Sequence, residues 1–516
     1  MKDVAAWYEG RTVLVTGGAG FMGKVLLEKM LRALPGLRRV YVLLRAKRGV
    51  APARRLHDML QLPVFEKLRA ERPEALQKLE AVEGDLLADG LGLSAGDRAR
   101  VQAEVSVVFH GAASLRLEAE LKAAVQHNTL GTLRVLELCK GMPKLEALIH
   151  LSTAFCHCEE AVLEERVYPP LKDPHEVLRV VQFLDDEPLR AITPELLGKH
   201  PNCYTFSKRL AETLVDEEKE RMPVVIVRPS IVSPSFKEPL PGWVDSLNGP
   251  IGLTVGAGKG VIRSMLCGTD YFAEVIPVDI VTNFMIVAAW DRAVNKKHVK
   301  ETPVFNVSNG DVVKVTWGEV VERGRQLSYQ YPFDYVVWYP DGNIRSSHLV
   351  HNLIVFFFQT IPAYLIDFLM LLFLQKTFMV RLQKRISVGM EVLQYFTMRQ
   401  WIFNIEKFKA TAESLCPKDR EIFYSTNVEF DMEKYLLNLL LGARMYCMKE
   451  PLSTLPRARR HLKIMFVVHH LSKILFYGFM IYLLVQYIEP LRYSLDYTLT
   501  SLGKTPIFRN FITSSS

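Results

Sequence analysis

The chain has 516 residues, of which 49% are hydrophobic and 23% are charged, and its formal net charge is +8 at pH 7. This length allows two or more domains with a large core, and the basic balance suits phosphorylated ligands or anionic lipid. We expect no nucleic-acid binding, because the sequence has no basic run interleaved with aromatic residues. The seven cysteines show no framework spacing, which indicates a reducing compartment.

The first apolar strand, at residues 13–16, leads into a glycine-spaced turn and a helix that begins near Phe21. Backbone amides approach a pyrophosphate closely only where side chains are absent, and the positive end of the helix faces the same phosphates. Gly18, Gly20 and Gly23 fit the G-x-G-x-x-G fingerprint, whereas Gly17, Gly20 and Gly23 fit the wider spacing of short-chain dehydrogenases. Both registers predict a bound dinucleotide. The residues expected to bind it here are Thr16, Gly17, Gly18, Gly20, Phe21, Met22 and Gly23.

Further apolar strands, each followed by turn residues, alternate with helical patterns along the chain. We expect strands at residues 39–44, 79–83, 105–110, 145–151 and 224–227, and helices at residues 25–34 and 117–139. Continuous Val, Leu and Ile in the strands indicate burial on both faces, which is typical of parallel sheets. The sequence therefore predicts an α/β fold with a doubly wound parallel sheet of about six or seven strands.

The second strand ends in Arg45, followed by two more basic residues, where an NAD-binding protein normally has an acid for the ribose 2′-hydroxyl. No acid is expected in reach, and guanidinium groups suit a 2′-phosphate, so NADPH is the expected cofactor. Asp85 and Leu86 end the third strand, where Asp85 could meet the adenine amine. Ala112 ends the fourth strand, and its small side chain leaves room for the cofactor.

Tyr204 and Lys208 lie four residues apart, so on a helix they share one face. The Lys208 ammonium then favours the phenolate, which makes Tyr204 a usable proton donor and acceptor near neutral pH. Ser152 and Thr153 follow the fifth strand, at the sheet edge where ligands bind, and one of these hydroxyls could bond a substrate carbonyl. These four residues are the expected catalytic group, and Lys208 is also expected to bind the nicotinamide ribose.

Motifs spread over almost the whole chain resemble those of the fatty acyl-CoA reductases, NADPH-dependent relatives of the extended short-chain dehydrogenases. The resemblance implies reduction of a long-chain fatty acyl-CoA to a primary alcohol through a bound aldehyde, feeding wax ester or ether lipid synthesis. It gives the same four residues the catalytic role, with Thr153 or Ser152 as the third member. The matching segments are residues 8–10, 16–26, 44–45, 109–113, 150–154, 204–208, 228–232 and 238–260.

Two positions depart from the family pattern. Residues 17–20 read Gly-Gly-Ala-Gly where Gly-Ala-Thr-Gly is usual, and residues 114–115 read Ser-Leu where Thr-Val is usual. Neither departure touches the reacting groups, so they put acyl chain-length preference in doubt and not activity.

The domain organisation follows from the resemblance and from hydropathy. Residues 1–330 are expected to form the NADP-binding reductase domain with substrate-binding insertions, and residues 345–450 a helical C-terminal domain. Within the latter, residues 354–374 are apolar but are interrupted by a glutamine, a proline and an aspartate. We therefore expect a buried or interfacial helix there and not a membrane span.

A second apolar segment, residues 466–488, follows a basic cluster at residues 457–463 and predicts a C-terminal membrane helix that anchors the chain by its tail. Residues 489–516 would then form a lumenal tail; an interfacial amphipathic helix is the alternative. The first strand begins near Arg11, which leaves no room for a secretory signal, so the catalytic domain should face the cytosol. The resemblance implies the peroxisomal membrane, with the endoplasmic reticulum membrane as the alternative.

Other interpretations concern particular residues. The loop at residues 233–263, rich in Gly and Pro, should shape the substrate entrance, where Lys259 or Arg263 could meet coenzyme A phosphates. Residues 156–158 read Cys-His-Cys, which cannot supply four tetrahedral ligands, so no metal site is expected.

Two other functions remain open from the sequence. A membrane-bound sterol or nucleotide-sugar dehydrogenase would share the glycine turn and the Tyr/Lys pair, but is not expected to carry residues 239–260. A non-enzymatic, membrane-anchored NADPH-binding scaffold is the alternative of a different class. The oligomeric state is left open.

Overall fold

The computed structural model describes residues 3–488 apart from residues 296–300, 310–313 and 427, together with residues 493, 494, 497 and 498. Apart from those last four residues, the expected lumenal tail lies outside the described part of the chain.

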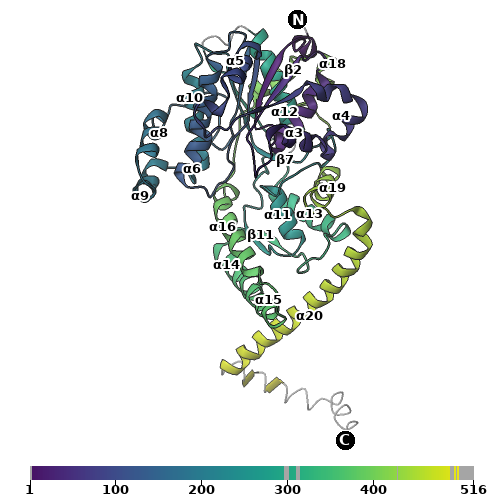
Figure 1. The fold of residues 1–516 in the computed structure, drawn as a ribbon. Coiled ribbons are helices and arrows are strands. Elements are labelled where there is room, and N and C mark those ends of the chain that lie inside the picture. Colours follow the sequence, from purple (N-terminus) through teal and green to yellow (C-terminus); the bar gives the residue numbers. More distant parts are fainter. Residues whose placement is uncertain are drawn as a thin grey trace.

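Seven strands pair in parallel in the order β10-β6-β5-β4-β1-β2-β3, and they form the central layer of the upper part of the molecule in Figure 1. Val13 of β1 lies opposite Val40 of β2 on one side and Val107 of β4 on the other. The strand order therefore reverses at β1, and such a reversal opens a ligand crevice at the carboxyl ends of the strands. The predicted doubly wound parallel sheet is confirmed. The strands are β1 (Thr12–Thr16), β2 (Arg39–Leu44), β3 (Leu79–Glu83), β4 (Val107–His110), β5 (Ala147–Leu151), β6 (Val224–Pro229) and β10 (Val304–Val307).

Helices cover both faces of this sheet, as the unbroken burial of β1 and β6 requires. One face packs against α2 (Phe21–Ala33), α12 (Val278–Val294) and α17 (Glu406–Glu413). The other face packs against α5 (Ala95–Glu104), α7 (Gly131–Cys139) and α10 (Cys203–Glu217). The single helix expected at residues 117–139 is instead α6 (Leu121–Val125), a π-helical turn η4 (Gln126–Leu130) and α7.

A smaller apolar cluster lies beyond the carboxyl edge of the sheet, where α11 (Pro250–Gly258), α13 (Trp317–Gln330) and α19 (Met432–Gly442) pack together. Two short parallel sheets border it, β7 (Ile231–Ser233) with β9 (Val275–Pro277), and β8 (Ser264–Leu266) with β11 (Asn343–Arg345). Helices α8 (Pro174–Phe183) and α9 (Asp186–Leu197) project from one side of the molecule (Figure 1). The remaining short elements are α1 (Val4–Trp7), α3 (Pro52–Leu60), η1 (Pro63–Phe65), α4 (Glu66–Glu71), η2 (Pro73–Lys78), η3 (Asp89–Gly92), α18 (Pro417–Ile422), η7 (Ala443–Cys447) and η8 (Leu452–Thr454).

Two apolar legs extend from the body in the same direction (Figure 1). The first is a hairpin of α14 (His348–Val355), the π-helical turn η6 (Phe356–Thr360), α15 (Ile361–Leu372) and α16 (Met379–Thr397). The second is α20 (Leu455–Tyr487). By length and composition, His348–Leu372 and Leu452–Tyr487 are apolar enough to cross a membrane, and only 17% and 6% of their most apolar windows are buried. Of the buried or interfacial helix expected at residues 354–374, the buried form is therefore wrong, since most of its large apolar side chains are exposed; the interfacial form stays a prediction.

The first part of the segment expected as the tail anchor packs against the body. His469 is 2% exposed, accepts a hydrogen bond from the Trp338 indole at 2.8 Å and lies 2.9 Å from Asp341. Lys473 pairs with the same carboxylate at 2.9 Å. The polar residues that interrupt the apolar pattern thus dock one side of α20 on the body, while apolar residues on its other side, such as Val467 and Leu471, stay exposed.

Candidate active site

The turn after β1 has the geometry of a phosphate-binding loop. Gly17 has φ +77°, and a Cβ there would lie 2.7 Å from the Ala112 nitrogen. A Cβ on Gly23 would lie 2.2 Å from the Gly17 carbonyl oxygen, so the helix start packs directly on the turn. Gly20 is the exposed N-cap of α2 and would meet only the Gly17 oxygen, at 3.1 Å. The first amides of a helix have no partner within the helix, so those of α2, beside the exposed Gly20, suit a pyrophosphate.

Gly18 differs from the other three glycines, because a side chain there would clash with a side chain and not with the backbone. A Cβ at this position would lie 2.5 Å from Cγ1 of Val42, so Gly18 is required by packing against β2. Both glycine registers read from the sequence thus contain glycines at which a side chain would clash. The glycine with a positive φ, Gly17, belongs to the wider register. Phe21 and Met22 follow as half-buried residues of the first turn of α2.

Thr16 joins the ends of two neighbouring strands. Its hydroxyl lies 2.8 Å from Nδ1 of His110 and accepts a hydrogen bond from the Ala112 amide at 3.2 Å. The other ring nitrogen of His110 lies 3.0 Å from the Thr132 hydroxyl. Through the hydrogen bond with the Ala112 amide, the buried Thr16 holds Ala112 beside the glycine turn.

Arg45 does have an acid in reach, contrary to the expectation from sequence. Its guanidinium lies 3.5 Å from the Asp85 carboxylate, and the two side chains are 52% and 35% exposed. The Asp85 carboxylate also accepts a hydrogen bond from the Leu87 amide at 3.0 Å. Leu86 faces Gly131, where a Cβ would lie 2.8 Å from its Cδ2. The third strand therefore brings Asp85 beside Arg45, and both remain accessible to a ligand.

Helix α10 and the end of β5 lie against each other. Asn202 caps α10 by accepting a hydrogen bond from the Thr205 amide, which fixes the helix start just before Tyr204. The Lys208 ammonium donates to the Leu151 carbonyl at 2.6 Å. The Thr153 hydroxyl forms a hydrogen bond with Tyr204. The structure thus brings together the residues that the sequence predicted as a catalytic group.

Ser152 and Thr153 differ in what their hydroxyls reach. The Ser152 hydroxyl points to the Cys156 sulfur at 3.7 Å. The Thr153 oxygen accepts from the Phe155 amide at 3.3 Å and lies beside Tyr204. Thr153 is therefore the better placed of the two for a group bound next to the phenol.

Burial controls the titration of this pair. It raises the pKa of Tyr204, and the hydrogen bond from Thr153 only partly opposes this shift. Burial lowers the pKa of Lys208 to about 8, although the nearby Glu212 carboxylate opposes the shift. The expected net lowering of the Tyr204 pKa is thus not what the structure shows. A raised pKa keeps the phenol protonated near neutral pH, which is the form that a proton donor needs.

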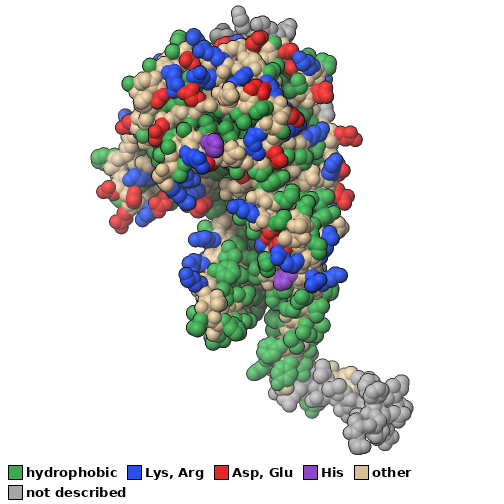
Figure 2. Space-filling model, turned by 45° about the vertical axis from the view of Figure 1, so that its right-hand side comes forward, with side chains coloured by type: hydrophobic (Ala, Val, Ile, Leu, Met, Phe, Trp, Pro, Cys, Tyr) green, Lys and Arg blue, Asp and Glu red, His purple; other side chains and the backbone are tan. Residues whose placement is uncertain are grey.

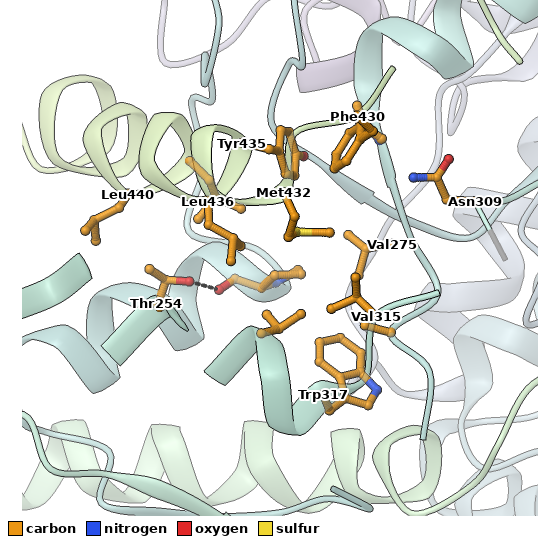
Figure 3. Close-up of a pocket in the computed structure, with 16 residues that line it drawn as sticks. Thr254, Val275, Asn309, Val315, Trp317, Phe430, Met432, Tyr435, Leu436 and Leu440 are labelled. Atoms are coloured by element: carbon orange, nitrogen blue, oxygen red, sulfur yellow. Dashed lines mark hydrogen bonds between the residues drawn. The ribbon is translucent and has the colours of Figure 1, made fainter. Parts of the chain in front are cut away.

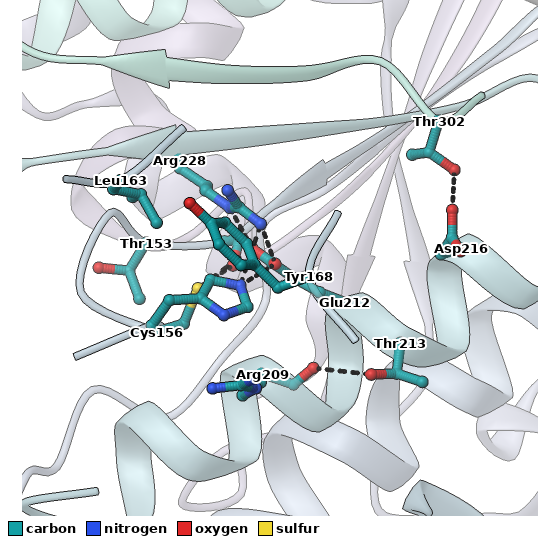
Figure 4. Close-up of polar contacts among 12 residues, drawn as sticks. Thr153, Cys156, Leu163, Tyr168, Arg209, Glu212, Thr213, Asp216, Arg228 and Thr302 are labelled. Atoms are coloured by element: carbon teal, nitrogen blue, oxygen red, sulfur yellow. Dashed lines mark hydrogen bonds and ion pairs between the residues drawn. The ribbon is translucent and has the colours of Figure 1, made fainter. Parts of the chain in front are cut away.

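A buried ion-pair network lies behind the pair, and sequence reasoning missed it (Figure 4). Glu212 is two helical turns after Tyr204 and pairs with Arg228 at 2.6 Å; its side chain is 2% exposed and that of Arg228 is 0% exposed. His157 lies 2.9 Å from the same carboxylate, and the Cys156 thiol points to it at 3.2 Å. The Arg228 cation holds the pKa of Glu212 well below its usual range despite burial. Spacing of four residues on α10 was the signal that could have found Glu212.

The cysteines and histidine of residues 156–158 do not act together. Cys156 and His157 lie with Glu212 so that one possible ligand atom of each falls within 4.8 Å of the others. Arg228 contacts both oxygens of that carboxylate, and a cation there opposes a metal ion. The Cys158 thiol points elsewhere, to the Phe155 carbonyl. Burial raises the pKa of both thiols, which keeps them protonated and weakly nucleophilic.

A second group missed from the sequence sits in the π-helical turn η4. The Asn128 side chain exchanges hydrogen bonds with the Ser114 backbone and donates to the Ser207 hydroxyl at 2.9 Å. Ser207 precedes Lys208, so Asn128 ties the strand end after β4 to the catalytic helix. Turns of this kind recur at functional sites, and the hydrophobic periodicity of the sequence does not signal them.

Three comparisons place this chain among known proteins. A family model described as male sterility protein matches residues 15–285, and a second model of the same description matches residues 358–450. Fatty acyl-CoA reductase 1 of Xenopus laevis is 37% identical over 462 residues, which cover 90% of this chain and 89% of that protein. The human fatty acyl-CoA reductase 1 is 36% identical over the same shares of the two chains. This chain belongs to the fatty acyl-CoA reductase family.

Family membership identifies the chain as an oxidoreductase that uses a nicotinamide cofactor. Fatty acyl-CoA reductase 2 of Bos taurus is 34% identical over 471 residues, which cover 91% of each chain. Among solved structures, the reductase domain of a nonribosomal peptide synthetase from Mycobacterium tuberculosis has a TM-score of 0.57 at 18% identity. It covers 85% of this chain and 92% of that one, and so supports the fold.

An apolar pocket of the reductase opens between α11, α13 and α19 (Figure 3). Phe21, in the first turn of α2, packs against the apolar cluster to which the pocket belongs. Tyr435 borders the pocket and donates to the Pro234 carbonyl at 2.9 Å, next to β7. Side chains that line the pocket include Val275, Val315, Trp317, Met432, Leu436 and Leu440.

The segment after β7 covers the start of α2. Trp243 is 1% exposed and stacks on Phe21 with ring centroids 5.4 Å apart. Lys24 pairs with Asp245 at 2.5 Å. Neither pair was predicted from the sequence, and the expectation that this loop shapes the substrate entrance stays a prediction.

Lys259 and Arg263 are not free to bind coenzyme A phosphates, and that expectation is wrong. Lys259 pairs with Glu450 at 2.8 Å, and both side chains are largely buried. Arg263 is 7% exposed and pairs with Asp341 at 2.5 Å. These cations instead join the α11 region to the C-terminal helices.

Proposed function

We propose that this chain reduces a long-chain fatty acyl-CoA to a primary alcohol through a bound aldehyde, with NADPH as the cofactor. The observation that carries the proposal is the placement of Tyr204, Thr153 and Lys208 at the carboxyl edge of the sheet, beside the glycine turn. Curated relatives at 34–37% identity, named fatty acyl-CoA reductases, support it. The alcohol would feed wax ester or ether lipid synthesis.

The residues divide the chemistry among themselves. NADPH, when bound, supplies a hydride to the substrate carbonyl carbon in each of two reduction steps. Tyr204 donates a proton to the carbonyl oxygen, and the Thr153 hydroxyl donates a hydrogen bond to the same oxygen. After the first step the oxygen returns its proton to Tyr204 as the carbon–sulfur bond breaks, which leaves an aldehyde; coenzyme A departs as the thiolate and takes a proton from water. In the second step Tyr204 protonates the aldehyde oxygen as the carbon is reduced, and the product is the alcohol. No protein thiol takes part, because the buried Cys156 and Cys158 remain protonated.

Lys208 and Arg45 hold the two ends of the cofactor in this proposal. Lys208 binds the nicotinamide ribose, while the amides at the start of α2 bind the pyrophosphate. Arg45 binds the 2′-phosphate, and Asp85 beside it orients the guanidinium and accepts from the adenine amine. Half-exposure of Arg45 suits a residue that must reach a ligand.

The acyl chain is proposed to occupy the apolar pocket between α11, α13 and α19. The transfer of a hydrocarbon chain from water into an apolar site has a favourable free energy. This pocket is lined mainly by aliphatic and aromatic side chains. The pocket belongs to the same apolar cluster against which Phe21 packs, which supports this assignment.

The reductase is proposed to be attached to a membrane by α20, with the catalytic domain in the cytosol. The peroxisomal membrane is the proposed location, and the endoplasmic reticulum is the alternative. A full crossing needs about 20 apolar residues, so residues 466–473 would have to leave the body for α20 to span. Residues 489–516 would then be lumenal, and an interfacial α20 is the other arrangement.

The direct test is to incubate membranes that carry the protein with palmitoyl-CoA and NADPH. Hexadecanol should form, with two NADPH consumed for each alcohol, and membranes that carry Tyr204→Phe should form none. Absence of turnover with bound NADPH would favour a scaffold. Oxidation of a sterol or nucleotide sugar in place of acyl-CoA reduction would assign the site to another dehydrogenase class.

A further inference from the structure

The outer part of the hairpin of α14 to α16, which consists of α15, the turn at residues 373–378 and the first two turns of α16, has large apolar side chains that contact little of the body. Leu374 at the tip is 94% exposed, and Phe373 is 74% exposed. Figure 2 shows apolar side chains gathered on both legs below the charged body. Other exposed apolar residues of α15 are Ile361, Tyr364, Leu365, Phe368, Leu369, Leu371 and Leu372.

The polar residues that interrupt this apolar segment are satisfied within the protein. Asp367 is 9% exposed and accepts hydrogen bonds from the amides of Phe378, Met379 and Val380 at 2.9–3.0 Å, which caps the start of α16. Gln359 is 5% exposed and accepts from the Arg263 amide at 2.7 Å. Lipid cannot supply such partners, so a segment that enters it must supply them itself.

Both ends of the hairpin are fixed to the same edge of the body. At one end, the Ser264 hydroxyl of β8 lies 2.8 Å from the His351 ring. At the other end, Thr397 donates to the Leu266 carbonyl of β8 at 2.7 Å. The chain therefore leaves and returns on one side. The 12 residues of α15 extend about 18 Å at 1.5 Å per residue, less than the hydrocarbon thickness of about 30 Å.

Basic side chains accompany the apolar ones around the tip of this hairpin, in the stretch between Asp367 and Glu391. Residues 368–390 contain Lys376, Arg381, Lys384 and Arg385, all exposed, and no aspartate or glutamate. Long basic side chains can place their charge at the headgroups while their stems lie along apolar surface. Anionic headgroups fit this charge, whereas a second copy of the hairpin would bring like charges together.

The second leg, α20, passes beside the hairpin. Phe476 of α20 contacts Phe357 and Phe358 of η6, with ring centroids 6.0 and 5.3 Å apart. Beyond Lys473, which pairs with Asp341, α20 continues from Ile474 to Tyr487, a length of 14 residues or about 21 Å. The two legs therefore contact each other through aromatic side chains near the start of α15.

We infer that the hairpin is a second membrane-binding element, which inserts α15 and its tip into the lipid leaflet facing the body, without crossing, while the four cations contact anionic headgroups. This element holds the body against the bilayer in addition to α20. The inference concerns membrane contact alone and does not depend on the reaction proposed above.

Depth-dependent fluorescence quenching in the full-length protein tests the inference. A fluorophore on Leu371→Cys, in a Cys416→Ser, Cys447→Ser background, reports on α15 in phosphatidylcholine and phosphatidylserine vesicles. We expect a blue-shifted emission, quenching by acyl-chain doxyl lipids and protection from iodide. A label on Leu115→Cys, an exposed leucine of the catalytic body, is the matched control and should show the opposite pattern. Labelling of the background protein measures the contribution of the remaining cysteines.

Two outcomes overturn the inference. Iodide quenching of the Leu371→Cys label without lipid quenching means that the hairpin stays in water. Energy transfer between labelled copies without lipid quenching means that a second copy covers it. The double variant Lys384→Glu, Arg385→Glu should reduce lipid quenching on vesicles with phosphatidylserine but not on pure phosphatidylcholine. An equal effect on both vesicles removes the assigned headgroup contact.

Discussion

Lys208 donates its ammonium hydrogen bond to the main-chain carbonyl of Leu151, across 2.6 Å. This contact fixes the catalytic helix against the carboxyl end of β5, immediately before Ser152 and Thr153. It also buries the ammonium, and burial lowers its pKa to about 8. The contact with Leu151 therefore both positions the Lys208 ammonium and keeps it in the buried environment that lowers its pKa.

Cofactor affinity should fall as pH rises through about 8. Lys208 is charged below this pKa and neutral above it, so its charged hydrogen bond to the ribose is lost at high pH. We expect the loss to be on the order of tenfold, from about 1.5 kcal/mol for such a bond. Titration of NADPH fluorescence from roughly pH 6.5 to 9.5, which brackets the lowered lysine pKa, measures it. In Lys208→Met the dependence should disappear; a persistent break would assign it to another group.

Replacing Tyr204 by Phe should lower turnover by about two to four orders of magnitude, because the proton donor is removed. NADPH binding should stay close to normal, since the glycine turn and Lys208 are untouched. Steady-state alcohol formation and cofactor binding are the two measurements.

The control for this variant is Cys203→Ser on the same helix, together with Cys156→Ser and Cys158→Ser. Substantial activity should remain in each, because burial keeps these thiols protonated. Trapping of an acylated cysteine would contradict direct reduction of the thioester.

Arg45→Gln should raise the KM for NADPH by about tenfold and leave the KM for NADH nearly unchanged, because one charged contact to the 2′-phosphate is lost at a half-exposed position. The neighbouring Arg48→Gln serves as the control. Gln is chosen over Asp, since an added carboxylate would repel Asp85. Equal use of both cofactors by the unmodified enzyme would refute the role of Arg45.

Glu212→Gln should destabilise the reductase by about 3–5 kcal/mol, because it leaves the buried Arg228 cation without its partner. Thermal unfolding in detergent, followed by intrinsic fluorescence, should show a clearly lower midpoint. Glu217→Gln on the same helix, which breaks a half-exposed pair with His175, should change the midpoint little. Similar midpoints for the two variants would mean that Glu212 is not the anchor of this network.

A protease test decides how α20 meets the membrane. If α20 spans, a tag placed after Ser516 should be protected in intact organelles, and the protein should resist carbonate extraction. Degradation of the tag would place the C-terminus in the cytosol. In that case the contacts of His469 and Lys473 with Asp341 are kept and α20 enters one leaflet only.

The sequence by itself determined the parallel sheet and the cofactor turn, because both depend on local chemistry. Continuous Val, Leu and Ile define strands buried on two faces, and the close backbone contacts at Gly17 and Gly23 permit no side chain. Spacing of four residues likewise puts Tyr204 and Lys208 on one helix face. These features need no knowledge of distant partners.

Only the tertiary structure decided which polar side chains are free and which are committed to partners. Asp85 comes beside Arg45, and Arg228 beside Glu212, because neighbouring elements of the fold converge. Lys259 and Arg263 pair with carboxylates far away in the chain. The apolar residues 354–374 form one exposed arm of a hairpin. The polar residues within them, Gln359 and Asp367, accept hydrogen bonds from residues on other elements. Such pairings depend on three-dimensional proximity, which periodicity and composition do not encode.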